Sequence, residues 1–185
     1  MPSQDWHFDA VPPGARAIFT CVPTVNKAVV AAMVGATEAA EAVGQELAAL
    51  LAGYGSINRA ARAAQVPTIG VAHGTVNGCV TEHGVPMAGF DHEFTTTSLF
   101  SAGVQAFMLG HIHKHQSWDD SGRVIAYAGS IGRFHHGELD AKGFLQWEVG
   151  AAVARIRLVE TPARRTVDLV FEGGRDADQI AAASR

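Results

Sequence analysis

The feature that most constrains the fold is an apolar run that ends in two histidines separated by one residue. Residues 107–109, Phe-Met-Leu, lead into Gly110, His111 and His113. Alternate residues of an extended chain point to the same side, so both imidazoles can face one place, and Gly110 lets the backbone approach closely. On its own, a histidine pair at this spacing more often lies in a loop without binding a metal. In the context of the neighbouring strands described next, it predicts a metal site where a strand ends.

Two other short apolar runs also end in polar residues. Residues 66–72 lead to His73, and residues 124–128 lead to Ser130, with Arg133 following closely. The loops that leave strand ends are where α/β proteins place their chemistry. The three runs together predict polar side chains gathered at one edge of a sheet.

The rest of the pattern predicts an α/β fold with a mixed sheet in a single domain over 1–185. The chain has 185 residues, of which 48% are hydrophobic, enough for a substantial core. Residues 53–55, Gly-Tyr-Gly, are expected to break a long alanine-rich helical region. Predicted strands span about 16–22, 66–73, 104–109, 123–128, 143–149, 153–160 and 166–171, and predicted helices span about 25–52, 56–64, 95–102 and 175–183.

These motifs follow one another in an order that resembles the calcineurin-like metallophosphoesterases, and within them the bacterial SbcD-type DNA-repair exonuclease subunit. The resemblance covers most of the chain and implies part of a metallophosphoesterase-type β-sandwich flanked by helices. Its segments are 17–23, a strand ending in proline, then 72–76 (Ala-His-Gly-Thr-Val), 109–114 (Leu-Gly-His-Ile-His-Lys), 127–131 (Tyr-Ala-Gly-Ser-Ile), Gly-Glu at 137–138 and Lys-Gly-Phe at 142–144.

The resemblance also implies roles for individual residues. His73 and His111 would bind one divalent ion and His113 a second, while Ser130 and Arg133 would contact the substrate. Two adjacent cations activate a water, clamp a phosphodiester and stabilise an in-line displacement. Imidazole suits manganese, iron or zinc. The expected cofactor is Mn²⁺, with two ions if the site is completed, and the expected function is a metal-dependent phosphodiesterase or DNA exonuclease.

The sequence departs from the family where the family supplies carboxylates. It contains no Gly-Asp-x-x-Asp and no Gly-Asn-His. The triplet 5–7, Asp-Trp-His, matches the family's Asp-x-His in letters, but no apolar strand precedes it, and the edge of an alternating strand is the favoured interpretation for Asp5 and His7. Three neutral imidazoles cannot hold two divalent ions close together against their mutual repulsion. On their own they indicate one loosely held ion.

Other carboxylates and histidines are weaker candidates. Most of the carboxylates lie in segments that resemble solvated turns, notably the predicted hairpin turn at 118–122. The remaining histidines are expected at the surface or the rim of the site and are not predicted as ligands. The carboxylates are Asp91, Glu93, Asp119, Asp120 and Glu138, and the histidines are His83, His92, His135 and His136.

Two functional interpretations follow. The first is a phosphodiesterase or exonuclease that is complete only after self-association or with a chain that carries the missing motifs; the resemblance also implies DNA as substrate and an SMC-like ATPase partner. The second is a catalytically inactive remnant that acts as a binding or scaffolding module. A rearranged gene product without a selected role is a third.

The net charge and the hydropathy argue against DNA binding by bulk electrostatics and against membrane contact. A net charge of −4 argues against binding DNA by bulk electrostatics. The best basic group is Arg155, Arg157, Arg164 and Arg165, although Arg155 and Arg157 alternate in a way that favours the solvated face of a strand. The sequence has no charged-then-apolar leader and no apolar run of transmembrane length, so we expect a cytoplasmic protein without membrane contact, with Cys21 and Cys79 as reduced thiols.

Overall fold

The computed structural model describes residues 11–24, 32, 35–85, 93–136, 138–165 and 182. Its first sheet is mixed, because β1, β2, β3 and β5 run parallel and β4 pairs with β5 in the antiparallel direction. The predicted α/β class with a mixed sheet is therefore confirmed. In spatial order the strands are β1 (Ile18–Cys21), β2 (Thr68–His73), β3 (Ala106–Gly110), β5 (Arg123–Tyr127) and β4 (Gln116–Asp120).

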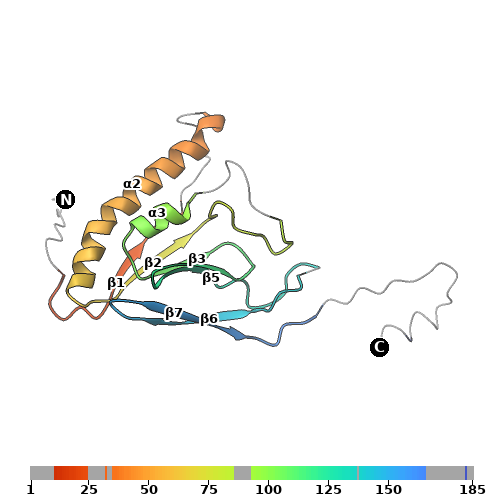
Figure 1. Cartoon of the computed structure of the whole chain (residues 1–185). Helices are drawn as coiled ribbons and strands as arrows, with labels where there is room; N and C mark the ends of the chain where they lie inside the picture. The colour runs from red at the N-terminus through yellow and green to blue at the C-terminus, as the bar shows by residue number, and fades with distance from the viewer. Residues whose placement is uncertain are drawn as a thin grey trace, which may run out of the picture.

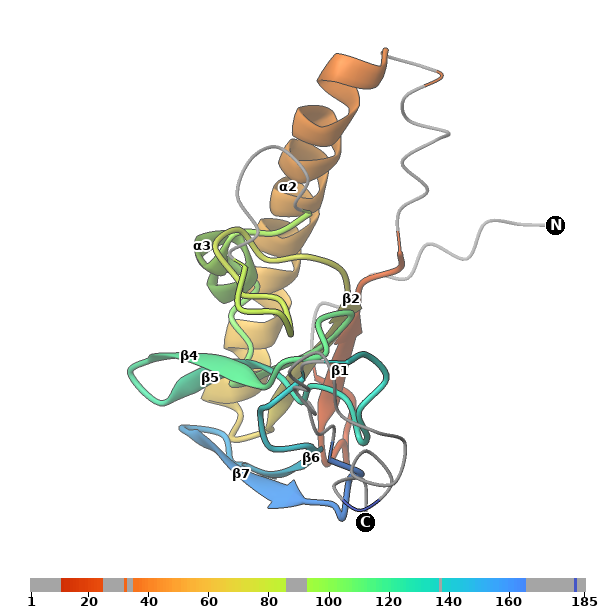
Figure 2. The same cartoon turned by 90° about the vertical axis from the view of Figure 1, so that its right-hand side faces the viewer.

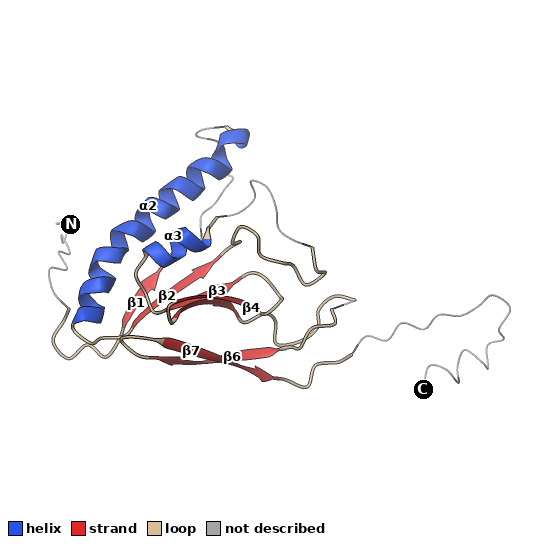
Figure 3. Cartoon of the chain, viewed as in Figure 1, coloured by secondary structure: helices blue, strands red, loops and turns tan. Residues whose placement is uncertain are grey.

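A second, two-stranded sheet consists of β6 (Gly143–Val149) and β7 (Ala154–Glu160). Figure 1 shows this hairpin below the first sheet, with the helices α2 (Ala36–Ala63) and α3 (Thr96–Ser101) above it. The quarter-turn view in Figure 2 keeps the same separation, and Figure 3 shows the resulting order of helix, sheet and sheet. The two sheets thus pack as a sandwich with helices on one outer face.

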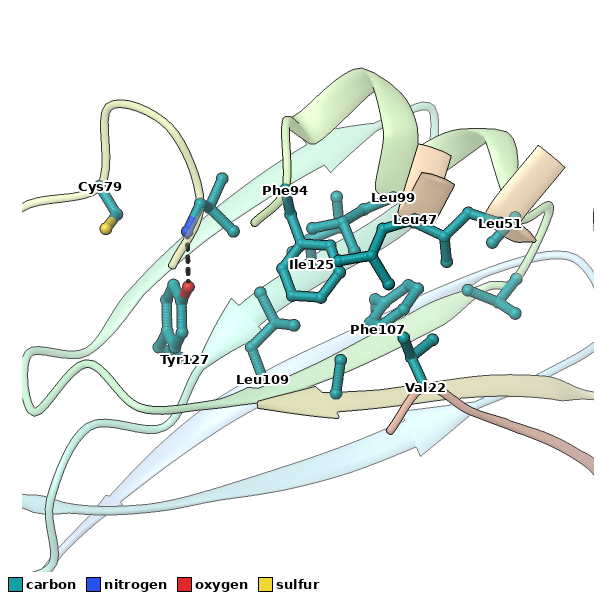
Figure 4. Close-up of a cluster of buried hydrophobic side chains, with 14 of the residues drawn as sticks. Val22, Leu47, Leu51, Cys79, Phe94, Leu99, Phe107, Leu109, Ile125 and Tyr127 are labelled. Carbon is teal, nitrogen blue, oxygen red and sulfur yellow. Dashed lines mark hydrogen bonds between the residues drawn. The ribbon is translucent and has the colours of Figure 1, made fainter. Parts of the chain in front are cut away.

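Each face of the first sheet has its own apolar cluster. On the helical face, side chains of α2 and α3, including Leu51 and Leu99, pack on Phe107 and Ile125 (Figure 4). The opposite face packs against β6 and β7 through Ile69, Ala106, Val124, Ala126 and Ala154, with Leu145, Trp147 and Ile156 at its margin. Removing both faces from water is the main stabilising term for this arrangement.

Part of the second face remains uncovered. Phe19, on the edge strand β1, is 61% exposed. Cys21 and Val71, which are register partners on β1 and β2, are also exposed beside it. Such a surface favours contact with another chain.

The predicted break in the long helix is wrong. Helix α2 continues through Gly53 and Gly55 without interruption. A Cβ added at Gly55 would lie 2.4 Å from the carbonyl oxygen of Ser101, and the Asn58 side chain donates to the carbonyl of Ala102 at 2.8 Å. Gly55 therefore allows α2 to approach the end of α3 closely, which outweighs its low helix propensity.

The short helix predicted at about 95–102 is confirmed as α3. It begins with a capping box in which Thr95 and Ser98 each accept the other's backbone N–H. The hairpin turn predicted at 118–122 is shorter than expected, because residues 118–120 belong to β4, a strand that was not predicted. The turn itself falls at Ser121 and Gly122, which both have positive φ. The predicted strand at 166–171 lies outside the described residues, as do most of the helical segments predicted at 25–35 and 175–183, together with Asp5, His7, Asp91 and His92. No helix in the described ranges is long and apolar enough to cross a membrane.

Candidate metal centre

The register of the parallel strands brings the predicted histidines to one edge. His73 closes β2 and is the register partner of Gly110 at the end of β3, so His111 follows directly beside it. The His73 and His111 ring centroids are 5.3 Å apart, in an edge-on arrangement at 67°. A Cβ at Gly110 would lie 2.9 Å from Nδ1 of His73, so any side chain at position 110 would displace the His73 ring. Both imidazoles are exposed and accessible to a ligand.

The backbone at His111 has a φ of 114°, a conformation that residues other than glycine rarely adopt. Conformations of this kind cost about 1–3 kcal/mol and persist where the surrounding structure imposes them, often at functional sites. The neighbouring Ile112 is buried, which anchors the loop between the two histidines of the motif. The strain thus coincides with the first histidine that the sequence singled out.

His113 lies in a different group of potential ligands. One ligand atom from each of Glu82, His113 and His135 lies within 4.8 Å of the others. The His113 and His135 rings are stacked at 14° with centroids 6.0 Å apart, and Nδ1 of His113 is buried without a hydrogen-bond partner. His83 stands at the edge of the group, with Nε2 at 3.9 Å from Oε1 of Glu82. Sequence reasoning predicted only His113 of these residues as a ligand.

A buried ion pair connects the backbones of His113 and His135. The Glu138 and Lys142 side chains are 0% and 1% exposed, and Nζ of Lys142 lies 2.5 Å from Oε2 of Glu138. Oε1 of Glu138 accepts the His135 N–H at 2.9 Å and the Phe134 N–H at 3.3 Å, while Lys142 donates to the His113 carbonyl at 3.1 Å. The expectation that Glu138 lies in a solvated turn is wrong, because its carboxylate is engaged inside the loop.

The charge of Glu138 is maintained despite its burial. Burial alone would raise the pKa of this carboxyl, but the Lys142 ammonium and the N–H groups of His135 and Phe134 together lower it below its ordinary value. Glu138 is therefore an ionised structural group at neutral pH rather than an open metal ligand.

The two residues predicted to contact substrate have partners within the protein. Ser130 is buried and its hydroxyl donates to the Gly132 carbonyl at 2.8 Å. The Arg133 guanidinium donates to the backbone carbonyls of Glu138 at 2.7 Å, Asp140 at 3.1 Å and Arg164 at 3.0 Å. Both side chains hold the loops around the site together, and their contact with substrate stays a prediction.

Buried hydrogen bonds fix the loop that follows His73. The Tyr127 hydroxyl, at the end of β5, donates to the Gly74 carbonyl at 2.6 Å. It also accepts the Val76 N–H at 3.0 Å, the bond dashed in Figure 4. Oε2 of Glu93 accepts the Thr75 N–H at 2.6 Å. Burial raises the pKa of Tyr127, so the hydroxyl keeps its proton. These contacts hold the His73 strand end in register with β3 and β5.

Glu93, Asp119 and Asp120, the other candidate carboxylates that the structure describes, do not join a metal group within the described residues. Asp119 accepts the Gly122 N–H, and Asp120 pairs with Arg123, as expected for a hairpin turn. In the described part of the chain, Glu82 is the carboxylate that meets two histidines. No sequence motif marks it, since it lies 31 residues before His113.

A comparison with models of known families finds no match, and no curated protein matches the chain. The resemblance to metallophosphoesterases therefore depends on the order of the motifs and stays a prediction.

Proposed function

We propose that this protein is a divalent-metal-dependent phosphodiesterase. The observation that carries the proposal is the convergence of His73 and His111 from two adjacent strand ends, with His113, a member of a second ligand group, on the same loop as His111. Imidazole donors suit iron and zinc, and the expected Mn²⁺ would need carboxylate or water oxygens beside them. Bound there, such ions would supply a nucleophilic water and neutralise charge on a phosphodiester.

The residues around the edge fit a two-part site. His73 and His111 are exposed and would hold one ion, while His113 would hold a second with Glu82 and His135. The donor chemistry fits, because the buried Nδ1 of His113 has no protein partner and a neutral imidazole coordinates cations. The chain's own contribution is to fix these rings on strand ends and to keep one side of the site open to substrate.

A non-catalytic metal-binding module is the second candidate. It is favoured because three candidate carboxylates already have partners within the protein. Glu138 is paired with Lys142, and Asp119 and Asp120 are held in their hairpin. Two close divalent ions need negative charge between them, and among the described residues only Glu82 meets a histidine group. Self-association or a partner chain at the exposed Phe19 face would be one source of further carboxylates.

DNA as substrate, with an SMC-like ATPase partner, is the narrower form of the first proposal. Arg155 and Arg157 are exposed on β7, and Arg164 and Arg165 are exposed after it. Arg157 donates to Gln146 on β6, which is typical of a solvated strand face. Basic residues of this number would give weak, salt-sensitive contact with phosphates rather than tight binding.

Hydrolysis of bis-p-nitrophenyl phosphate by the metal-stripped chain, with and without added Mn²⁺, tests the proposal. We expect Mn²⁺-dependent turnover that falls at least about 100-fold in His73→Ala and in His111→Ala, because both rings would hold the ion that positions the phosphodiester. His136→Ala is the matched control, since His136 is exposed and lies outside the candidate metal group.

Three outcomes separate the candidates. Turnover that persists in His111→Ala would indicate a contaminating enzyme and contradict the proposal. Tight metal binding without turnover would support the non-catalytic module. Turnover that appears only above a threshold protein concentration would support a site completed by self-association.

A further inference from the structure

We infer that Glu82, His113 and His135 form a single-ion site for a transition metal of the zinc type, and that the buried Glu138–Lys142 pair positions it. This inference does not depend on phosphodiester hydrolysis. It concerns one ion and a set of ligands that the motif order does not contain. It also predicts a metal preference that differs from the Mn²⁺ expected from the resemblance.

The geometry is close to that of an occupied site. A tetrahedral zinc with ligands at about 2.0–2.1 Å has neighbouring donor atoms about 3.3–3.4 Å apart. The three donors already lie within 4.8 Å of one another, so small side-chain rotations bring them to the ion. Three protein ligands with two imidazoles and one glutamate leave a fourth position open for water or an anion, as in sites where zinc is catalytic.

The buried nitrogen of His113 independently indicates a ligand. Nδ1 of His113 is shielded from solvent and has no hydrogen-bond partner. A buried polar atom in this condition costs free energy, and it is usually satisfied by a protein group, water or ion. Coordination through one ring nitrogen changes the hydrogen-bonding role of the other and gives the ring a defined tautomer. A metal ion bound by the His113 ring is one partner that would satisfy this group.

The ion pair fixes both histidines before the ion arrives. Glu138 holds the backbone N–H of His135, and Lys142 holds the backbone carbonyl of His113. Because the two side chains are bonded to each other in the interior, the separation of the two histidine backbones is set by one rigid contact. Groups outside the ligand set that orient ligands typically change metal affinity about 10–100-fold when removed.

The donor set also selects the metal. Two imidazoles and one carboxylate favour zinc and its neighbours over manganese, and they exclude magnesium and calcium, which require more oxygen ligands. The order of affinity expected from the ligand types is Zn²⁺ above Co²⁺ above Mn²⁺, with no measurable Mg²⁺ binding. A preference for Mn²⁺ over Zn²⁺ would contradict this assignment.

Calorimetric titration of Zn²⁺ into the metal-stripped full-length chain tests the inference. The titration uses His73→Ala/His111→Ala as its background, so that an ion at those two histidines cannot contribute. We expect one Zn²⁺ per chain, weakened at least about tenfold by Glu82→Gln and by His135→Ala and changed less than about twofold by His136→Ala. Zn²⁺ binding that is unaffected by Glu82→Gln and His135→Ala, or absent altogether, would overturn the assignment.

A thermodynamic cycle separates positioning from general stability. Glu138→Gln should weaken Zn²⁺ binding about tenfold when His135 is present and should have almost no further effect in the His135→Ala background. A purely structural role would lower affinity by the same factor in both backgrounds, and that result would refute positioning. Circular dichroism at the titration temperature confirms that each variant is folded. No phosphodiester is present, so the outcome is separate from the test of hydrolysis.

Discussion

Removal of one hydroxyl tests whether the strand-end loop is held as the structure indicates. Tyr127 is fully buried, and its hydroxyl is bonded to both the Gly74 carbonyl and the Val76 N–H. Tyr127→Phe leaves these two backbone groups without a partner in a space that the phenyl ring still fills. An unsatisfied buried polar group costs about 1–3 kcal/mol, so the free energy of unfolding should fall by about 2–4 kcal/mol.

Urea denaturation followed by circular dichroism measures this loss. With a slope of about 2 kcal/mol per molar urea, the midpoint should decrease by about 1–2 M. The chain offers a matched control, because Tyr54→Phe makes the same chemical change at a half-buried tyrosine whose hydroxyl has no hydrogen bond within the described part of the chain. Equal midpoints for the two variants would refute the claim that Tyr127 holds the loop after His73.

Four further predictions concern the ion pair, the thiols and the open sheet face. Lys142→Met should lower the free energy of unfolding by about 3–5 kcal/mol at pH 7, because it leaves a buried carboxylate unpaired. The pKa of Glu138 is lower in the folded chain than its ordinary value of 4.5. The stability that its charge contributes is therefore complete above pH 4.5 and is lost as the pH falls through the folded pKa. In thermal melts, the difference in melting temperature between the wild type and Glu138→Gln should shrink from pH 7 to pH 3. Iodoacetamide should modify exposed Cys21 well before Cys79, which is buried and whose pKa is raised by that burial, and equal rates would contradict the buried position. Phe19→Ser should lower the mass that light scattering reports at high concentration, whereas an unchanged concentration dependence would argue against association through this face.

Local signals predicted the parts of the site that local sequence determines. The strands ending at His73 and Gly110 are short apolar runs bounded by glycine and proline, so each strand end was recognisable from nearby residues, although the pairing that brings the two histidines together is a long-range contact. The helix at 95–102 and the turn at Gly122 were predictable because each depends on residues within a few positions.

Long-range contacts set the parts that the sequence did not predict. Glu82 and His135 are 53 residues apart, and nothing in either segment indicates that they meet at His113. The spacing of Glu138 and Lys142 is typical of a solvated pair, yet the loop buries both completely. Gly55 was expected to end a helix, although its lack of a side chain serves the approach of α2 to α3. In each case the tertiary environment outweighed the local preference.

The backbone of His111 gives the last test of whether its imidazole is retained for binding. A non-glycine residue at a φ of 114° carries about 1–3 kcal/mol of strain, and glycine relieves it at an entropic cost of about 0.5–1 kcal/mol. Alanine keeps the strain and also lacks the ring. His111→Gly should therefore be more stable than His111→Ala by about 1 kcal/mol in urea denaturation, while both variants lose metal at this position equally.

That combination would show that the backbone at residue 111 is strained and that the imidazole is needed to bind metal there. A ring present only for packing would instead make the wild type more stable than the glycine variant by the full value of the lost contact with His73. A glycine variant less stable than the alanine variant would mean that the backbone at residue 111 is unstrained. In that case the strain would no longer support a binding role, and the case for His111 as a ligand would depend on its position beside His73 alone.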